Sequence, residues 1–238
     1  MTIYLDRFYK KLKKDLKGSL VKVAKIKELE PNAKEYLNKL AKAGRIEHVS
    51  WGWYWVPDNY RDIFDFLRKD KNFKMLSSQS AASFWNYDFI HREIYNIKVY
   101  DRSYGKALEV FARSRGWNVE VEYVENTSEI KYVRRGGIYV EAIDENIIDC
   151  LQRWAFTDAF AVFFVNKERI KSRELSKRAY WKRIARSDVR VRQALAYGAH
   201  RFNQSLGRVV FSTRKTTIKD EFVRRGVDEA VQKVVEFA

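Results

Sequence analysis

The first 27 residues carry hydrophobic side chains at the spacing of two helices. In residues 3–17, leucine and aromatic residues recur every three or four positions, so one face of a helix would be apolar. Residues 20–27 show the same period over a shorter length, and Ser19 precedes them as a candidate N-cap. Pro31 then interrupts the pattern, because proline does not continue a helix. The pattern therefore predicts two helices followed by a turn.

A third amphipathic helix and a β-hairpin are predicted next. Asn32 is a candidate N-cap, and Gly44 ends the helix, since glycine readily adopts the left-handed conformation of a C-cap. Residues 46–49 and 53–56 are rich in β-branched and aromatic side chains and flank a turn at Ser50-Trp51-Gly52. Three helices and a hairpin in this order are typical of a winged helix-turn-helix, in which one helix enters a DNA groove and the hairpin forms a wing beside it.

After residue 72 the pattern becomes first mixed and then mostly helical. Strands are expected at 94–99, 119–123, 130–133 and 138–140. Helices are expected at 59–69, 76–85, 105–115, 145–154, 158–165, 172–186, 189–205 and 217–237. We therefore predict an α+β fold. A winged helix-turn-helix DNA-binding domain covers 1–72, and an α+β domain covers 73–238, with a small mixed β-sheet and a mostly helical C-terminal region for dimerisation or partner binding.

Composition indicates a folded protein outside the membrane. Of the 238 residues 46% are hydrophobic, enough to build a packed core. No apolar run approaches the roughly 18 to 20 residues of a membrane span. The N-terminus lacks the residue order of a signal peptide. The single cysteine, Cys150, cannot form an internal disulfide and is expected in the core. A cytoplasmic protein is therefore expected, with no membrane partner.

The positive charge is concentrated in the two terminal thirds. The chain has a net charge of +16, and residues 1–74 carry 18 basic against 10 acidic side chains. Residues 167–238 carry 19 basic against 8 acidic, whereas residues 75–166 are slightly acidic. A basic segment that also has a helix-turn-helix pattern favours contacts with the phosphates of double-stranded DNA. The alternative is a solvated, charge-rich surface without a nucleic-acid partner.

The polar face of the predicted third helix carries the candidate base contacts. This face holds Lys34, Asn38, Lys39 and Lys42, and Asn32 stands at the start of the helix. In a major groove, Asn38 is suited to a bidentate contact with adenine, and the lysines to phosphates or guanine. The alternative is an ordinary solvated helix face, since lysine is common on helices.

Further candidate contacts flank this helix. Lys22 and Lys25 on the preceding helix, and Arg45 and His48 near the first strand of the hairpin, are placed to approach the phosphate backbone. Trp51 at the turn is suited to wedge into a minor groove or to cover a dimer contact. The aromatic residues that follow it, 53–55, are expected in the core.

A second basic stripe is predicted in the C-terminal third. Arg178, Lys182 and Arg186 recur every four residues on one helix face, and Arg190 follows them. The stripe is suited to grip DNA or an acidic protein partner. A solvated face explains the pattern equally well.

No enzyme site stands out in the sequence, and neither a cofactor nor a metal is expected. There is no P-loop, no dinucleotide-binding glycine pattern and no zinc-spaced Cys/His set. One catalytic alternative stays open. Glu129-Ile130-Lys131, with Asp101 and Glu120 before it, has the carboxylate-x-lysine pattern of Mg²⁺-dependent nucleases. A Glu-x-Lys triplet is also frequent by chance, and a non-catalytic protein-interaction module is the further alternative.

Three motifs resemble the AbiEi-type antitoxins, transcriptional regulators of type IV toxin–antitoxin systems. The first runs from Leu37 to Pro57, with Leu40, Gly44-Arg45-Ile46, Val49, Gly52 and Tyr54 at the family's positions. The second is Ser77-Ser78-Gln79-Ser80-Ala81-Ala82, similar to the helix after the winged domain. The third is the segment 140–149, similar to a strand that leads into an acidic helix.

This resemblance implies a specific biology. Members of the family repress their own operon through the winged domain, and their C-terminal domain counters a nucleotidyltransferase toxin. The resemblance thus implies an autorepressing antitoxin with DNA and a cognate toxin as partners. A homodimer is a further expectation, with the C-terminal region as its interface. His48 and Trp51 depart from the pattern, because basic residues are usual at those positions.

Overall fold

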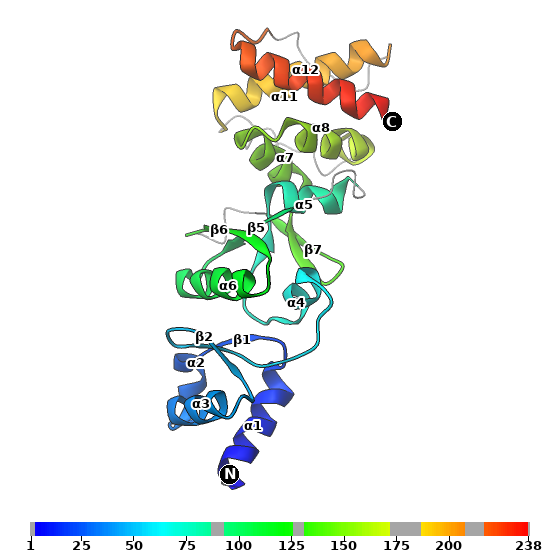
Figure 1. The fold of residues 1–238 in the computed structure, drawn as a ribbon. Helices are drawn as coiled ribbons and strands as arrows, with labels where there is room; N and C mark the ends of the chain where they lie inside the picture. The colour runs from blue at the N-terminus through cyan, green and yellow to red at the C-terminus, as the bar shows by residue number, and fades with distance from the viewer. Residues whose placement is uncertain (1–2, 87–92, 126–130, 172–186, 208–216, 238) are drawn as a thin grey trace. The chain divides into compact units, whose positions relative to one another are not determined.

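The structure is a computed structural model that describes residues 3–86, 93–125, 131–171, 187–207 and 217–237. The side chains at 170 and 171 are not described. The fold is α+β, with small sheets and a helical C-terminal part, as predicted (Figure 1). No described helix combines the length and the apolar character needed to cross a lipid bilayer.

The chain divides into two compact units. The first unit contains Met1–Met75, Ile97–Thr127 and Gly136–Tyr139, and the second contains Leu76–Asn96, Ser128–Arg135 and Val140–Ala238. This division differs from the predicted domains 1–72 and 73–238, because two later segments belong to the first unit.

The N-terminal part of the first unit contains helices α1 to α4 and strands β1 to β3. Their bounds are α1 Ile3–Leu16, β1 Leu20–Lys22, α2 Val23–Lys27, α3 Ala33–Lys42, β2 Glu47–Ser50, β3 Trp53–Trp55 and α4 Ile63–Lys69. The strands form an antiparallel sheet in the order β1-β3-β2. The β2–β3 hairpin turns at Trp51 and Gly52, and Gly52 adopts a φ of 74° that suits glycine. The predicted hairpin is therefore present.

The prediction of one helix over residues 20–27 was wrong. Leu20 pairs with Trp55 and Lys22 pairs with Trp53, so these first residues form a strand and only Val23–Lys27 is helical. The helical period over eight residues carries no information about a pairing partner more than thirty positions away. Strand β3 supplies that partner and outweighs the weak local helical preference.

One hydrophobic core joins α1, α2, α3 and the hairpin. Leu5, Leu12, Leu37, Leu40 and Val56 belong to this buried cluster. The cluster also contains Val21 of β1, Ile26 of α2 and Tyr54 of β3. Burying apolar surface from every element stabilises the short helices, which would be marginal alone in water.

An aromatic cluster explains why residues 97–127 belong to the first unit. Phe111 of α6 (Arg102–Ser114) lies with its ring centroid 5.3 Å from that of Trp55 and 4.8 Å from that of Phe66. Tyr60 and Trp117 complete the cluster. Rings that interlock in this way bury a large apolar area, and hydrophobic periodicity within one segment does not reveal such packing.

A second sheet contains five strands in the order β6-β5-β4-β8-β7. Their bounds are β4 Met75–Leu76, β5 Ile94–Val99, β6 Asn118–Tyr123, β7 Tyr132–Arg135 and β8 Ile138–Glu141. Strand β4 pairs with β8 in parallel, with Leu76 opposite Val140. The predicted glycine turn joins β7 to β8, and Gly136 and Gly137 both have positive φ angles.

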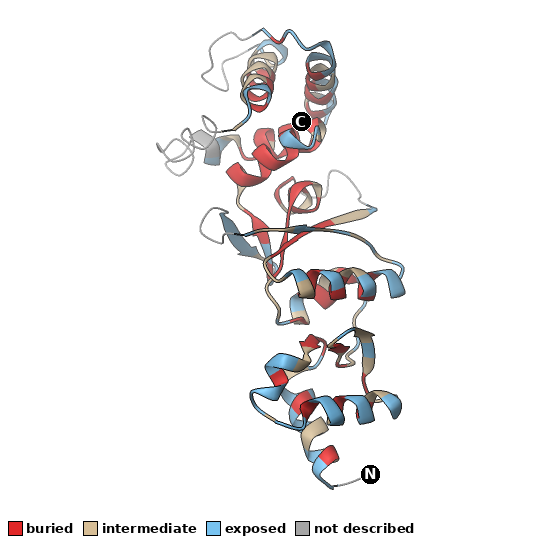
Figure 2. Cartoon of the chain, turned by 90° about the vertical axis from the view of Figure 1, so that its left-hand side faces the viewer, coloured by how far each residue is buried: buried red, intermediate tan, exposed pale blue. Residues whose placement is uncertain are grey.

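The second unit is mostly helical. Its described helices are α5 Ser78–Trp85, α7 Ile143–Gln152, α8 Phe156–Val165, α9 Lys167–Lys171, α11 Val189–Ser205 and α12 Glu221–Glu236. Helix α8 is almost entirely buried and packs against α7 and α12 (Figure 2). Cys150 is a buried free cysteine, as predicted. The helix predicted at 172–186 lies outside the described residues.

Candidate nucleic-acid interface

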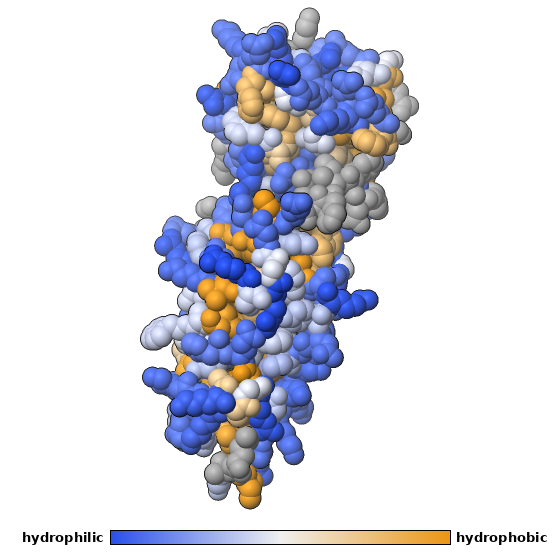
Figure 3. Space-filling view, viewed as in Figure 1, coloured by the Kyte–Doolittle hydropathy of each residue, from blue (hydrophilic) through white to orange (hydrophobic). Residues whose placement is uncertain are grey.

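Helix α3 separates an apolar side from a basic side. Ala33, Leu37 and Leu40 have no exposed surface. The polar positions Lys34, Asn38, Lys39 and Lys42 are all exposed to solvent. The visible surface of the N-terminal helices is accordingly mostly hydrophilic (Figure 3). The side chains predicted to contact bases are therefore not used in packing the core.

Asn38 is held in place by the hairpin. The hydroxyl of Tyr54 on β3 donates a hydrogen bond to the side-chain carbonyl oxygen of Asn38. Tyr54 is itself buried, and burial raises the pKa of its hydroxyl. A carbonyl oxygen has two lone pairs, so Asn38 keeps one acceptor site and both amide hydrogens for an external partner.

Glu35 modifies the charge of the same helix, and the sequence predictions missed it. Its carboxylate pairs with the ammonium of Lys39 one turn later, and both side chains are more than half exposed. The hydrogen bond with Glu35 and its negative charge raise the pKa of Lys39. The (i, i+4) spacing of Glu35 and Lys39 would have revealed this pair.

Lys22 is engaged within the first unit. Its ammonium lies 3.2 Å from the carboxylate of Asp101 and 2.6 Å from the hydroxyl of Ser103, and it sits over the ring of Trp53. Lys22 is therefore already paired with acceptors inside the first unit. Lys25 on α2, also predicted to approach the phosphate backbone, is exposed.

Asp101 is the acceptor that binds Lys22 and also begins α6. Burial by itself raises the pKa of Asp101, but hydrogen bonds from Ser103, the backbone of Tyr104 and Lys22 outweigh it and hold the pKa at about 2. The carboxylate accepts the backbone N–H of Ser103 at 2.8 Å, as expected of a helix N-cap. Asp101 thus has a structural role.

The remaining candidates divide into engaged and accessible residues. Arg45 pairs with Asp6 at 2.6 Å and lies over the ring of Tyr9. His48 is exposed, with its ring 5.0 Å from that of Tyr54. Asn32 is exposed and occupies the N-cap position of α3 as predicted, although its side chain makes no capping hydrogen bond.

Trp51 is the most exposed large side chain at the tip of the hairpin. It is 95% exposed, whereas the next tryptophan, Trp53, is 2% exposed. The prediction that residues 53–55 belong to the core is confirmed for Trp53 and Tyr54, whereas Trp55 is only partly buried. An indole in this position contributes nothing to the packing of the first unit and is available to a partner.

Most of the second basic stripe lies outside the described residues, namely Arg178, Lys182 and Arg186. Arg190 is described and exposed in the first turn of α11, where its backbone N–H is accepted by the N-cap Asp188.

The residues of the nuclease alternative are only partly described. Glu129 lies outside the described residues, and the ammonium of Lys131 lies 3.4 Å from the carboxylate of Asp144. Glu120 is exposed on β6. In the part of the chain that the structure describes, no group of three or more His, Cys, Asp or Glu side chains is placed to hold a metal ion.

No protein-family model matches the sequence, and no curated protein matches it significantly. The function must therefore be argued from the residues and their arrangement.

Proposed function

We propose that this protein is a sequence-specific DNA-binding transcriptional regulator whose residues 3–57 act as a winged helix-turn-helix. The exposed basic face of α3 is the observation that carries this proposal. Lys34, Asn38 and Lys42 project from a helix whose opposite side is fully buried, so the helix is rigidly held while its polar side stays free.

The order of elements supports the same interpretation. Helices α2 and α3 are separated by a short turn and pack together, and the β2–β3 hairpin follows directly. In this arrangement α3 is the recognition helix, with Asn38 reading a base and the lysines binding phosphates or guanine. Lys25, His48 and Trp51 extend the contact to the backbone and the minor groove.

The antitoxin role rests on the resemblance of the sequence motifs to the AbiEi-type family. As a member of that group the protein would act in the cytoplasm, repress its own operon as a dimer and counter a nucleotidyltransferase toxin. Rescue of growth when the chain is co-expressed with a toxin encoded beside it would support this part of the proposal. Continued growth arrest would exclude the antitoxin role and would leave the DNA-binding proposal unchanged.

Fluorescence anisotropy with a duplex from the protein's own promoter region tests the DNA-binding role. The triple variant Lys34→Ala/Asn38→Ala/Lys39→Ala is expected to lose its preference for this duplex over a scrambled one. A variant with the same loss of positive charge, Lys106→Ala/Arg113→Ala on the exposed side of α6, is the matched control. If both variants lose this preference equally, the protein binds DNA by general charge attraction. If the triple variant binds as the wild type does, α3 is excluded as the recognition helix.

A further inference from the structure

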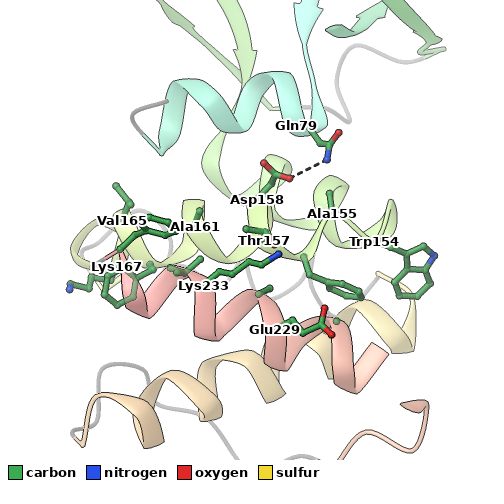
Figure 4. A pocket seen from close by; sticks show the side chains of 16 residues that line it. Gln79, Trp154, Ala155, Thr157, Asp158, Ala161, Val165, Lys167, Glu229 and Lys233 are labelled. Carbon is green, nitrogen blue, oxygen red and sulfur yellow. Dashed lines mark hydrogen bonds between the residues drawn. The ribbon is translucent and has the colours of Figure 1, made fainter. Parts of the chain in front are cut away.

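A groove of about 750 Å³ lies between α8 and α12 in the second unit (Figure 4). Its apolar lining includes Phe156, Ala161 and Phe164 of α8 and Val234 of α12. A volume of this size, with both apolar and polar side chains in its walls, lies in the range of sites that bind small organic molecules.

Two lysines place positive charge on this groove. Lys233 of α12 is exposed, and Figure 4 shows its side chain lying along the groove with the ammonium directed toward α8. Lys167 stands at one end, its ammonium 4.3 Å from the centre of the Phe164 ring. Within the described residues neither lysine forms an ion pair with a protein carboxylate.

The two carboxylates of the groove have partners of different kinds, an arginine for Glu229 and a neutral amide for Asp158. Glu229 pairs with Arg225 at 2.9 Å, and Asp158 accepts a hydrogen bond from the amide of Gln79 at 3.1 Å. By formal charge, Lys167, Lys233 and the adjacent Arg225 stand against Asp158 and Glu229, which leaves one net positive charge at the groove. This charge favours an anionic ligand.

The backbone conformation of Trp154 is a second feature that points to a ligand site, and it is independent of the lysines. Trp154 lines the groove at the end opposite Lys167 and has a φ of 58°, in the left-handed region that bulky residues rarely adopt. Its backbone closes α7, with the N–H of Trp154 donating to Leu151 and the N–H of Ala155 donating to Cys150. Glycine is the usual residue at this position of a helix end.

The strain at Trp154 is not explained by core packing, because this side chain is 37% exposed. Its ring lies beside those of Phe156 and Phe222, at centroid distances of 5.7 and 6.2 Å. Residues kept in unfavourable backbone conformations are often found at ligand sites. An exposed indole in such a conformation at the edge of a groove is suited to stack on a bound ring.

We propose that the α8–α12 groove binds a small molecule with an aromatic body and one anionic group. The aromatic body lies between Phe156, Phe164 and Trp154, and the anion is bound by the ammonium of Lys233. This inference concerns the second unit alone and does not depend on DNA binding by the first unit.

The experiment uses the full chain and two dyes of similar shape. 8-Anilinonaphthalene-1-sulfonate has an aromatic body and a sulfonate, whereas N-phenyl-1-naphthylamine lacks the anion. Fluorescence titration is expected to show saturable binding of both dyes with one site per chain, and tighter binding of the sulfonate. Absence of saturable binding would overturn the proposal.

Lys233→Met removes the charge at an exposed position and retains the aliphatic stem. It is expected to weaken sulfonate binding at least fivefold and to leave binding of the neutral dye unchanged. Lys219→Met, at an exposed lysine outside the groove, is the matched control and should change neither. Equal sulfonate affinity in the Lys233 and Lys219 variants would exclude the assigned anion contact.

Trp154→Gly separates binding from folding. Glycine suits the backbone conformation at this position, so the variant should melt within a few degrees of the wild type, while both dyes bind at least fivefold more weakly. Thr157→Trp, at a partly exposed position of the lining, should block the groove and remove both dyes. Unchanged dye binding in the Thr157→Trp variant would mean that the dyes bind outside the groove. Release of bound dye when the chain self-associates would mean that a second copy of the chain occupies the groove. Either result would overturn the proposal.

Discussion

The hydroxyl of Tyr54 on β3 donates its hydrogen bond to the side chain of Asn38 on α3. This contact connects the base of the hairpin to the centre of the helix that we propose to read DNA. It therefore fixes the orientation of one exposed amide from inside the domain, before any partner is bound.

Replacing this hydroxyl tests its contribution. Tyr54→Phe is expected to lower the free energy of unfolding by about 1 kcal/mol, the usual net value of a hydrogen bond. It should also weaken discrimination at the base that Asn38 contacts, because the amide is no longer oriented. Urea denaturation and anisotropy with single-base operator variants measure the two effects. Tyr4→Phe, at a residue that is 72% exposed, is the control and should leave both unchanged.

The pair between Glu35 and Lys39 predicts an increase in DNA affinity on mutation. Glu35→Gln removes a negative charge from the proposed interface and releases Lys39 for a phosphate. The plot of log affinity against log salt should become steeper by about 0.9, which corresponds to one additional phosphate contact. Glu229→Gln, which breaks an exposed pair of the same (i, i+4) spacing on α12, should leave the slope unchanged. Equal slopes for the Glu35 variant and wild type would place Lys39 outside the contact.

The low pKa of Asp101 predicts how stability depends on pH. The folded-state pKa of about 2 lies below the ordinary value of 3.8 for an aspartate, so the carboxylate stabilises the fold above about pH 4. This contribution is lost as the pH falls from about 4 to about 2. It is on the order of 1 kcal/mol, because the Asp101 side chain is 41% exposed and its ion pair is screened.

Urea denaturation of wild type and Asp101→Asn at a series of pH values measures how much the charge of Asp101 stabilises the protein. The wild type should be the more stable protein at pH 6, and the difference should shrink toward pH 2. A difference that stays constant across this range would mean that the N-cap geometry, and not the charge of Asp101, stabilises the helix.

Removal of a buried carboxylate in the second unit is expected to destabilise the protein more than loss of the Asp101 charge. Glu141 has no exposed surface and accepts hydrogen bonds from the backbone N–H of Ser78 at 2.9 Å and from the amide of Asn146 at 3.0 Å. Ser78 begins α5 with a φ of 46°, so the carboxylate holds an unfavourable turn in place.

Glu141→Ala is therefore expected to destabilise the protein by about 3 kcal/mol, because it leaves two buried donors without this acceptor. Thermal denaturation followed by circular dichroism measures the change. Glu168→Ala, at an exposed glutamate of α9, is the control and should alter the melting temperature by no more than a degree or two. A loss below about 1 kcal/mol for Glu141→Ala would show that water replaces the carboxylate.

Local pattern determined much of the fold. The amphipathic period of Leu5, Leu12, Leu37 and Leu40 predicted α1 and α3, and the glycines at 44 and 52 predicted where α3 ends and where the hairpin turns. These features depend on neighbours within a few residues, so they can be seen in the sequence alone. The exposed lysines of α3 follow from the same period, since the face opposite the leucines must point to solvent.

Tertiary structure decided what local pattern does not encode. Residues 20–22 form a strand because β3 pairs with them, and the ammonium of Lys22 lies beside Asp101, which is 79 positions away in the sequence. Residues 97–127 belong to the first unit because Phe111 packs among aromatic rings from distant segments. Pairing and packing between remote segments release free energy only when the chain is folded, so periodicity within one segment carries no record of them.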